Sequence, residues 1–234
     1  MPAPGLTARR HVLRQHYLFR DLTEAELDEL LTHARMTRFR AGDTICLRGA
    51  PGAGMMAILS GEVTISVTGA DGRQIILTRL GEGEIFGEIA LLDGGERTAD
   101  VVAAVDTELM TIDRRNFLPY LERHPPISIK LLVALCAKLR RTTEQVEDLA
   151  LMDLAPRLAK RLLTLAGIAG EPPLGAAKIE SAPTQGELAA MMGTSRESIN
   201  RQLSAWQRDG LLRLSPGSIV IEKAEALQRI VDRA

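Results

Sequence analysis

The feature that most limits how this chain can fold is a change of hydrophobic period after residues 124–126, His-Pro-Pro. From there on, apolar residues recur at alternating intervals of three and four positions, which places them in one stripe along a single long helix. The stripe consists of Leu132, Leu135, Leu139, Thr142, Val146 and Leu149. Such a heptad stripe is buried when a helix supercoils against a like partner, so we expect a parallel dimer; packing on the chain's own core is the alternative. Thr142 is the polar residue in this stripe, and its hydroxyl needs a hydrogen-bond partner. That partner could fix the register of the two helices, or it could be a bound ligand.

Before the long helix, the chain has the pattern of a β domain. One helical segment at 23–33 is followed by short apolar runs that turn signals such as Asp71-Gly72 and Asp93-Gly94 separate. The predicted strands are residues 43–47, 55–59, 63–67, 75–80, 101–105 and 108–112. Many short strands favour a closed or double-sheet architecture, because this covers the strand edges.

Two further helix starts follow the long helix. After an amphipathic helix at 155–168 and a connector rich in glycine, proline and alanine at 170–183, Thr184 and Glu187 form a capping-box pattern. A second start lies at Ser195, and Gly193 supplies the turn between the two helices. This order of helix, tight turn and helix predicts a helix-turn-helix.

The second of these helices has the pattern of a DNA-reading helix. Ile199, Leu203 and Trp206 form its predicted buried face, whereas polar residues crowd its N-terminal half, the part that reaches base edges. Two short apolar runs at 211–214 and 219–221 predict a two-stranded wing. Each polar residue alone could be a solvated or capping side chain; together with the wing they favour DNA binding. The predicted DNA-binding residues are Thr184, Ser195, Arg196, Glu197, Asn200 and Arg201.

Charge and composition agree with this interpretation and exclude other classes. The net charge is −1, but basic residues exceed acidic ones after Ala155, the sign that phosphate binding needs. No apolar run is long enough to span a membrane, and the two cysteines are not spaced as a disulfide framework or metal clip. We therefore expect a cytoplasmic protein without a prosthetic group or metal site. No catalytic constellation is apparent, so we do not expect an enzyme.

A second motif lies in the β-rich part. Gly87-Glu88-Ile89 is followed ten positions after the glycine by Arg97-Thr98, and this spacing resembles the phosphate-binding cassette of cyclic-nucleotide-binding domains. The residue types suit that ligand, because an arginine fork can hold a phosphodiester while a carboxylate can accept a hydrogen bond from a ribose hydroxyl.

The order of β domain, cassette, long helix and winged helix-turn-helix resembles the superfamily of bacterial transcription regulators that contains the cyclic AMP receptor protein and the fumarate and nitrate reduction regulator. The resemblance implies an α+β fold with an N-terminal β-roll of the jelly-roll type, a long dimerisation helix and a C-terminal winged helix-turn-helix. The implied domains are residues 1–124, 125–153 and 154–234. The cysteine clusters of the oxygen-sensing branch are absent.

The resemblance also assigns roles to residues. It implies that Gly87 and Glu88, beside Ile89, hold the ribose-phosphate, that Arg97 and Thr98 hold the cyclic phosphate, and that Thr142 and Thr143 hold the base. The sequence departs from the receptor-protein pattern in two ways. Lys138 replaces an arginine that supports the ribose-binding glutamate, and the loop between the cassette glutamate and arginine is one residue shorter. Threonine at position 98 is the pattern of cyclic GMP-selective modules.

These features predict a homodimeric regulator that a cyclic purine nucleotide controls. Cyclic AMP is the favoured effector and cyclic GMP the other candidate. We expect it to read a palindromic, TGTGA-like site in double-stranded DNA and to act with RNA polymerase, with no membrane partner. The alternative is the same DNA-binding regulator with a non-nucleotide or orphan sensor domain.

Overall fold

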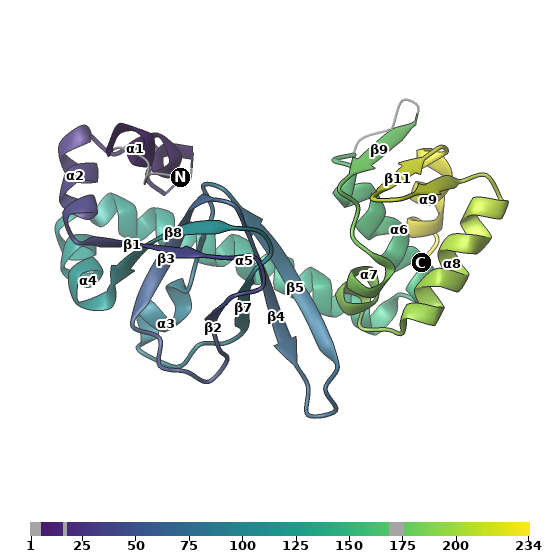
Figure 1. Cartoon of the computed structure of the whole chain (residues 1–234), viewed down its shortest axis with the longest axis horizontal. Coiled ribbons are helices and arrows are strands. Elements are labelled where there is room, and N and C mark those ends of the chain that lie inside the picture. The colour runs from purple at the N-terminus through teal and green to yellow at the C-terminus, as the bar shows by residue number, and fades with distance from the viewer. Residues whose placement is uncertain (1–5, 16–17, 169–175) are drawn as a thin grey trace. The chain divides into compact units, whose positions relative to one another are not determined.

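Two four-stranded sheets form the N-terminal part of the chain in the computed structural model, which describes residues 6–15, 18–168 and 176–234 (Figure 1). One sheet has the order β1-β8-β3-β6 and the other the order β2-β7-β4-β5. The strands are β1 (Ala34–Phe39), β2 (Thr44–Cys46), β3 (Gly54–Ser60), β4 (Glu62–Thr68), β5 (Gln74–Gly81), β6 (Ile85–Phe86), β7 (Asp100–Ala103) and β8 (Thr107–Asp113). The double-sheet β domain predicted from the sequence is confirmed.

The two faces of the sheet β1-β8-β3-β6 pack into two different hydrophobic clusters. Ile58 of β3 and Leu109 of β8 lie in one cluster with Cys46, Val63 and Val101 of the other sheet. Their neighbours along the strands point the opposite way, because successive side chains of a strand face opposite sides. Ala57, Leu59, Met110 and Ile112 therefore belong to a second cluster, which the helices of this unit cover.

Five helices accompany these sheets: α1 (Leu6–Gln15), α2 (Glu24–Thr32), α3 (Glu88–Asp93), α4 (Arg114–Arg123) and the start of α5 (Pro125–Leu151). Helix α2 begins with a capping box in which Thr23 and Glu26 exchange hydrogen bonds. Val12 and Leu13 of α1 and Phe117 of α4 are buried in the same cluster, together with Ile127 and Leu131 of α5. The first turns of α5 are thus fixed to the β domain.

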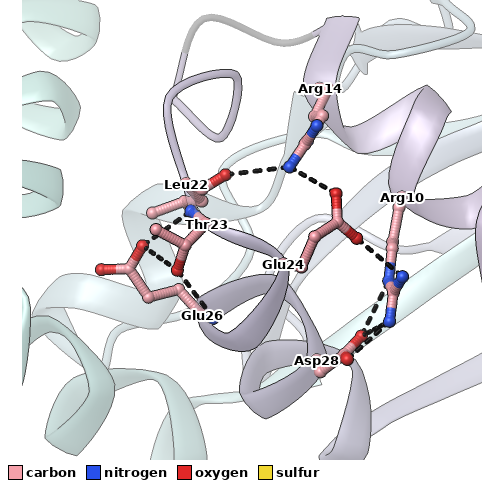
Figure 2. A network of polar contacts seen from close by, with 7 residues as sticks. All are labelled: Arg10, Arg14, Leu22, Thr23, Glu24, Glu26 and Asp28. Atoms are coloured by element: carbon pink, nitrogen blue, oxygen red, sulfur yellow. Dashed lines mark hydrogen bonds and ion pairs between the residues drawn. The ribbon is translucent and has the colours of Figure 1, made fainter.

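Two arginines attach α1 to α2 (Figure 2). Arg10 contacts Glu24 at 2.6 Å and donates from Nε to Asp28 at 2.8 Å. Arg14 pairs with Glu24 at 2.7 Å and donates to the carbonyl oxygen of Leu22 at 3.2 Å. Exposed ion pairs contribute at most about 1 kcal/mol each, so the buried apolar residues of α1 carry most of its attachment and the arginines set its orientation.

Helix α5 runs on into the second of two compact units. These units are Met1–Gly72 with Ile76–Ala137, and Arg73–Ile75 with Lys138–Ala234. The remaining helices are α6 (Leu154–Leu165), α7 (Gln185–Met192), α8 (Arg196–Arg208) and α9 (Ala224–Val231), and the remaining strands are β9 (Ala177–Glu180), β10 (Leu212–Ser215) and β11 (Ser218–Ile221). One apolar cluster joins them, with Leu158, Leu162, Leu188 and Leu227 all fully buried.

Several expectations about element boundaries were wrong. The predicted strand 101–105 ends at Ala103, because Val105 lies in a turn whose carbonyl oxygen accepts a hydrogen bond from the Thr107 hydroxyl. Helix α5 ends at Leu151, two residues before the end of the predicted dimerisation segment 125–153, and the extended Asp153 is the N-cap residue of α6. The predicted connector 170–183 contains β9, which pairs with β11 and makes the wing a three-stranded sheet; residues 169–175 lie outside the described residues.

No helix within residues 6–15, 18–168 and 176–234 combines the length and the apolar character that crossing a membrane requires.

Candidate functional site

The cassette begins where strand β6 turns into helix α3. Gly87 stands at this turn with a φ of +82°, which side chains with a Cβ rarely adopt. A Cβ at this position would also lie 2.3 Å from Nη1 of Arg97. The backbone turn therefore requires the glycine, and a side chain here would displace the guanidinium of Arg97.

Arg97 lies over this turn and is partly buried. Its Nη1 donates to the carbonyl oxygen of Gly87 at 3.1 Å, and its Nη2 donates to that of Gly54 at 2.8 Å. Its own backbone is fixed on the loop before β3, because its N–H donates to Ala50 O and its carbonyl accepts from Gly49 N. A guanidinium has five N–H donors, so these two side-chain contacts orient Arg97 while leaving it donors for an anion.

The other predicted nucleotide residues of the first unit lie in the same segment. Glu88 is the first residue of α3 and is buried, Ile89 is half-buried, and Thr98 is exposed beside Arg97. A buried carboxylate is costly unless hydrogen bonds or charges compensate for it, so the position of Glu88 fits a polar role in the cassette. The structure therefore brings Gly87 and Arg97 into contact and keeps Glu88, Ile89 and Thr98 close to them along the chain.

Thr142 and Thr143 lie on an exposed part of α5, in the second unit. Their hydroxyls donate back along the helix to the carbonyl oxygens of Lys138 and Leu139, at 3.0 Å each. These bonds use the proton of each hydroxyl, and each oxygen can still accept a hydrogen bond. The predicted contact with a nucleotide base stays a prediction.

The helix-turn-helix consists of α7 and α8, whose starts are both capped. The N–H of Glu187 donates to the Thr184 hydroxyl at 3.2 Å, and the N–H of Thr184 donates to the Glu187 carboxylate at 2.7 Å, which confirms the predicted capping box. Gly193 ends α7 at a φ of +62°. The hydroxyl of Ser195 then accepts from the N–H of Ser198 at 3.2 Å and starts α8.

Helix α8 separates an apolar face from a polar one, as predicted. Ile199, Leu203 and Trp206 are buried in the core of the second unit. The side chains of the predicted DNA-binding set are exposed, namely Thr184, Ser195, Arg196, Glu197, Asn200 and Arg201. Donors and acceptors therefore face outward on the N-terminal half of α8.

Two polar side chains on this face have defined surroundings. The pKa of Glu197 is lowered, chiefly by its own backbone N–H, then by the Ser195 hydroxyl and by nearby Arg196, so the carboxylate stays an ionised acceptor at neutral pH. Oδ1 of Asn200 accepts from Gln185 Nε2 and from Ser204 Oγ, both at 3.3 Å. Gln185 was missed in the sequence, because its link to Asn200 joins two helices.

Two family models match the chain. The model of the cyclic nucleotide-binding domain matches residues 36–124, and that of the Crp-like helix-turn-helix domain matches residues 156–230. The first of these matches contains the cassette, and the second contains the capped helices α7 and α8.

Relatives match over nearly their whole length. A CRP-like cAMP-activated global transcriptional regulator of Mycobacterium tuberculosis is 32% identical over 218 residues, which cover 93% of this chain and 97% of the relative. The cyclic AMP receptor protein of Thermus thermophilus is 34% identical over 213 residues, or 91% and 95% of the two chains.

Solved structures show the same fold. The catabolite activator protein of Thermus thermophilus has 33% identity and a TM-score of 0.54, with 92% of this chain and 98% of that chain covered. The c-di-GMP-responsive global regulator CLP of Xanthomonas campestris has 25% identity and a TM-score of 0.70, with 86% and 99% covered. This confirms the predicted fold, an α+β chain with a β-rich nucleotide-binding domain, a long helix and a helix-turn-helix. The chain therefore belongs to the cyclic AMP receptor protein family of DNA-binding transcription regulators, which are not enzymes.

Proposed function

We propose that this regulator is a homodimer whose affinity for DNA is set by a cyclic purine nucleotide bound in the cassette. The observation that carries the proposal is the contact of Arg97 with the turn at Gly87, which holds a cationic fork over the start of the cassette helix. As a DNA-binding regulator of bacterial type, it would act in the cytoplasm, with RNA polymerase as a further partner.

The nucleotide would use each cassette residue for one part of its structure. Arg97 and Thr98 would hold the cyclic phosphate, because a guanidinium and a hydroxyl both donate to phosphate oxygens. Glu88 would accept from the ribose hydroxyl, with Gly87 and Ile89 contributing backbone groups next to it. Thr142 and Thr143 would provide hydroxyls for the base.

Cyclic AMP is the effector that we propose. The relatives from Mycobacterium tuberculosis and Thermus thermophilus are both named for cyclic AMP. Thr98 keeps cyclic GMP as a second candidate, and the Xanthomonas campestris regulator of the same fold is named as responsive to c-di-GMP. These three nucleotides therefore form the ligand panel.

Calorimetric titration of the full chain with the three nucleotides tests this assignment. Loss of a charge-assisted pair costs about 2–5 kcal/mol, so Arg97→Ala is expected to weaken binding of the preferred nucleotide by about thirtyfold to several thousandfold. Arg115→Ala is the matched control, because that side chain is 81% exposed and lies in α4. Unchanged affinity in Arg97→Ala would remove Arg97 from the site, and a wild-type chain that binds none of the three would favour the orphan-sensor alternative.

The exposed stripe of α5 supports the dimer. Leu132, Leu139, Val146 and Leu149 are each more than half exposed in the single chain. A like helix with the same stripe would bury all four positions on both chains by heptad packing. The two α8 helices of such a dimer would be related by a two-fold axis.

DNA recognition follows from that symmetry. Two recognition helices on a dyad enter successive major grooves, so the half-sites should lie about one helical turn apart, each resembling TGTGA. Arg196 and Arg201 would present forks to guanine, and Glu197 would accept from the amino group of cytosine. Asn200 would use its amide N–H₂, since its Oδ1 already accepts two hydrogen bonds. Thr184 and Ser195, at helix starts, would contact phosphates.

Binding to the palindrome and to single-base variants, at fixed salt, tests the readout. Arg196→Ala is expected to lose preference at one guanine, by about 1–3 kcal/mol. Arg208→Ala is the control, since Arg208 is exposed on the same helix but about 18 Å further along it. Equal weakening on all sequences would make Arg196 a phosphate contact and refute the half-site assignment.

A further inference from the structure

The short cassette helix α3 is held at both ends by arginine side chains from other parts of the chain. Arg97 reaches the carbonyl oxygen of Gly87 at its start, as described above. At its end, Nε of Arg114 donates to the carbonyl oxygen of Leu91 at 2.7 Å, and Nη2 donates to that of Leu92 at 3.2 Å. The geometry points to Arg114 as a positioning residue for the nucleotide cassette, an inference that rests on the proposed function.

The two contacts of Arg114 satisfy groups that the helix itself leaves open. The last four carbonyl oxygens of a helix have no partner within the helix. In α3 the N–H of Gly94 takes that of Ala90, and Arg114 takes the next two. With only six residues, α3 has few internal hydrogen bonds, so a fork that binds two of its last carbonyls fixes a large part of it.

Both arginines also tie α3 to the same point of the β domain. The backbone N–H of Arg114 donates to the carbonyl oxygen of Ala53 at 2.8 Å, and Nη2 of Arg97 donates to that of Gly54 at 2.8 Å. Ala53 and Gly54 are neighbours at the start of β3. The two arginines that hold the start and the end of α3 are thus bonded to two consecutive peptide groups at the start of β3.

This arrangement matters for binding because Gly87, Glu88 and Ile89, which are proposed to contact the ribose and its phosphate, lie at the start of α3. A binding segment that is already fixed loses less conformational entropy when the ligand binds. Removing Arg114 would leave Gly87, Glu88 and Ile89 in place along the chain but release the far end of their helix. We expect nucleotide affinity to fall about tenfold to hundredfold, the range found when the residues that orient metal ligands are removed.

The neighbouring arginine offers a matched control. Arg115 has the same charge and follows Arg114 in α4, but its side chain is 81% exposed and forms a long ion pair with Asp113, at 3.7 Å. Arg115→Ala should leave nucleotide affinity unchanged. A loss shared by both variants would therefore reflect the charge of this surface rather than the hold on α3.

The test combines nucleotide titration with amide hydrogen exchange on the full chain, for wild type, Arg114→Ala, Arg114→Lys and Arg115→Ala, with cyclic AMP as the probe. Arg114→Ala should weaken binding and speed exchange within residues 88–94 while the rest of the first unit keeps its protection. Arg114→Lys should recover part of the affinity, because an ammonium can reach one carbonyl oxygen but not fork to two.

The outcomes separate this inference from the proposed function. Wild-type binding with unchanged affinity in Arg114→Ala overturns the role of Arg114 and leaves the proposed function intact. Faster exchange throughout the first unit also overturns it, because Arg114 would then be a general stabilising residue. A wild-type chain that does not bind cyclic AMP overturns both. Should Arg114→Ala not fold, Arg114→Lys decides alone, and wild-type affinity in that variant refutes the inference.

Discussion

Replacing Leu139 by alanine is expected to weaken a dimer through α5 strongly, because this side chain lies in the middle of the exposed stripe. Leu139 is 67% exposed in the single chain. Full burial of a leucine side chain contributes about 1.5–3 kcal/mol, so covering the exposed part contributes about 1–2 kcal/mol per chain. A two-fold dimer contains the residue twice, which gives about 2–4 kcal/mol. Since 1.4 kcal/mol is tenfold, the dimer dissociation constant should rise by about 30- to 700-fold.

Sedimentation equilibrium over a series of protein concentrations measures this change. Leu151→Ala is the matched control, because Leu151 is even more exposed, at 81%, on the same helix. It follows the last stripe position by two residues and so lies roughly 200° around the helix from it, on the opposite side. Replacing both Leu135 and Leu139 by glutamate should give monomers.

Two results would refute this reasoning. An unchanged dissociation constant in Leu139→Ala would mean that the stripe is not the interface. Equal weakening in Leu139→Ala and Leu151→Ala would mean that exposed apolar residues of α5 associate without the heptad register.

Two further predictions concern the first unit and the thiols. The pKa of Glu26 is lowered, chiefly by the N–H and hydroxyl of Thr23, and the pKa of Glu29 is lowered by Arg123. A group whose pKa is lower in the folded state stabilises the fold above its unfolded pKa. It loses this contribution as the pH falls through its folded pKa. Calorimetric unfolding should therefore show a loss of stability below about pH 4.3, and Glu26→Gln should flatten it; an unchanged slope would contradict the assignment. Burial raises the pKa of the Cys46 thiol, whereas Cys136 is exposed. A thiol reagent at neutral pH should therefore modify Cys136 quickly and Cys46 only after unfolding. Fast modification of both thiols would contradict the structure.

The parts of the fold that could be predicted are those with local signals. The capping residues Thr184 and Ser195 and the apolar spacing of Ile199, Leu203 and Trp206 define the helix-turn-helix without any distant contact. Six strands of the β domain were predicted from their short apolar runs, whereas β1 and β6 were missed, because β1 contains no fully buried residue and β6 has only two residues. Strand β9 was missed because only Ile179 of its four residues is buried, and it forms by pairing with β11.

The N-terminal helix α1 shows a different limit. Its mostly polar sequence, Leu-Thr-Ala-Arg-Arg-His-Val-Leu-Arg-Gln, offers no clear apolar stripe. It is held by Val12 and Leu13 in the core and by ion pairs of Arg10 and Arg14 with α2 (Figure 2), which are contacts with other elements of the chain. Such tertiary contacts override local propensity and cannot be read from spacing.

The candidate site likewise contains features that the sequence could predict and features that it could not. The cassette was recognisable because Gly87 and Arg97 keep a family spacing, and the structure places them in contact. Arg114 donates to the backbone carbonyl oxygen of Leu91, 23 residues earlier in the chain. A backbone acceptor is present at every residue, so no sequence pattern indicates this contact. The exposure of Leu139 was likewise not readable from a pattern that a buried helix could also show.

The central claim, that a nucleotide controls DNA binding, is tested most directly by fluorescence anisotropy of a labelled TGTGA palindrome at fixed salt, with and without saturating cyclic AMP. Coupling between two sites is usually 1–3 kcal/mol, so the nucleotide should tighten DNA binding by about 5- to 150-fold, and the palindrome should tighten nucleotide binding by the same factor. Thr142→Ala should reduce this factor more than it reduces DNA binding without nucleotide. Equal DNA affinity with and without a nucleotide that demonstrably binds would contradict the account.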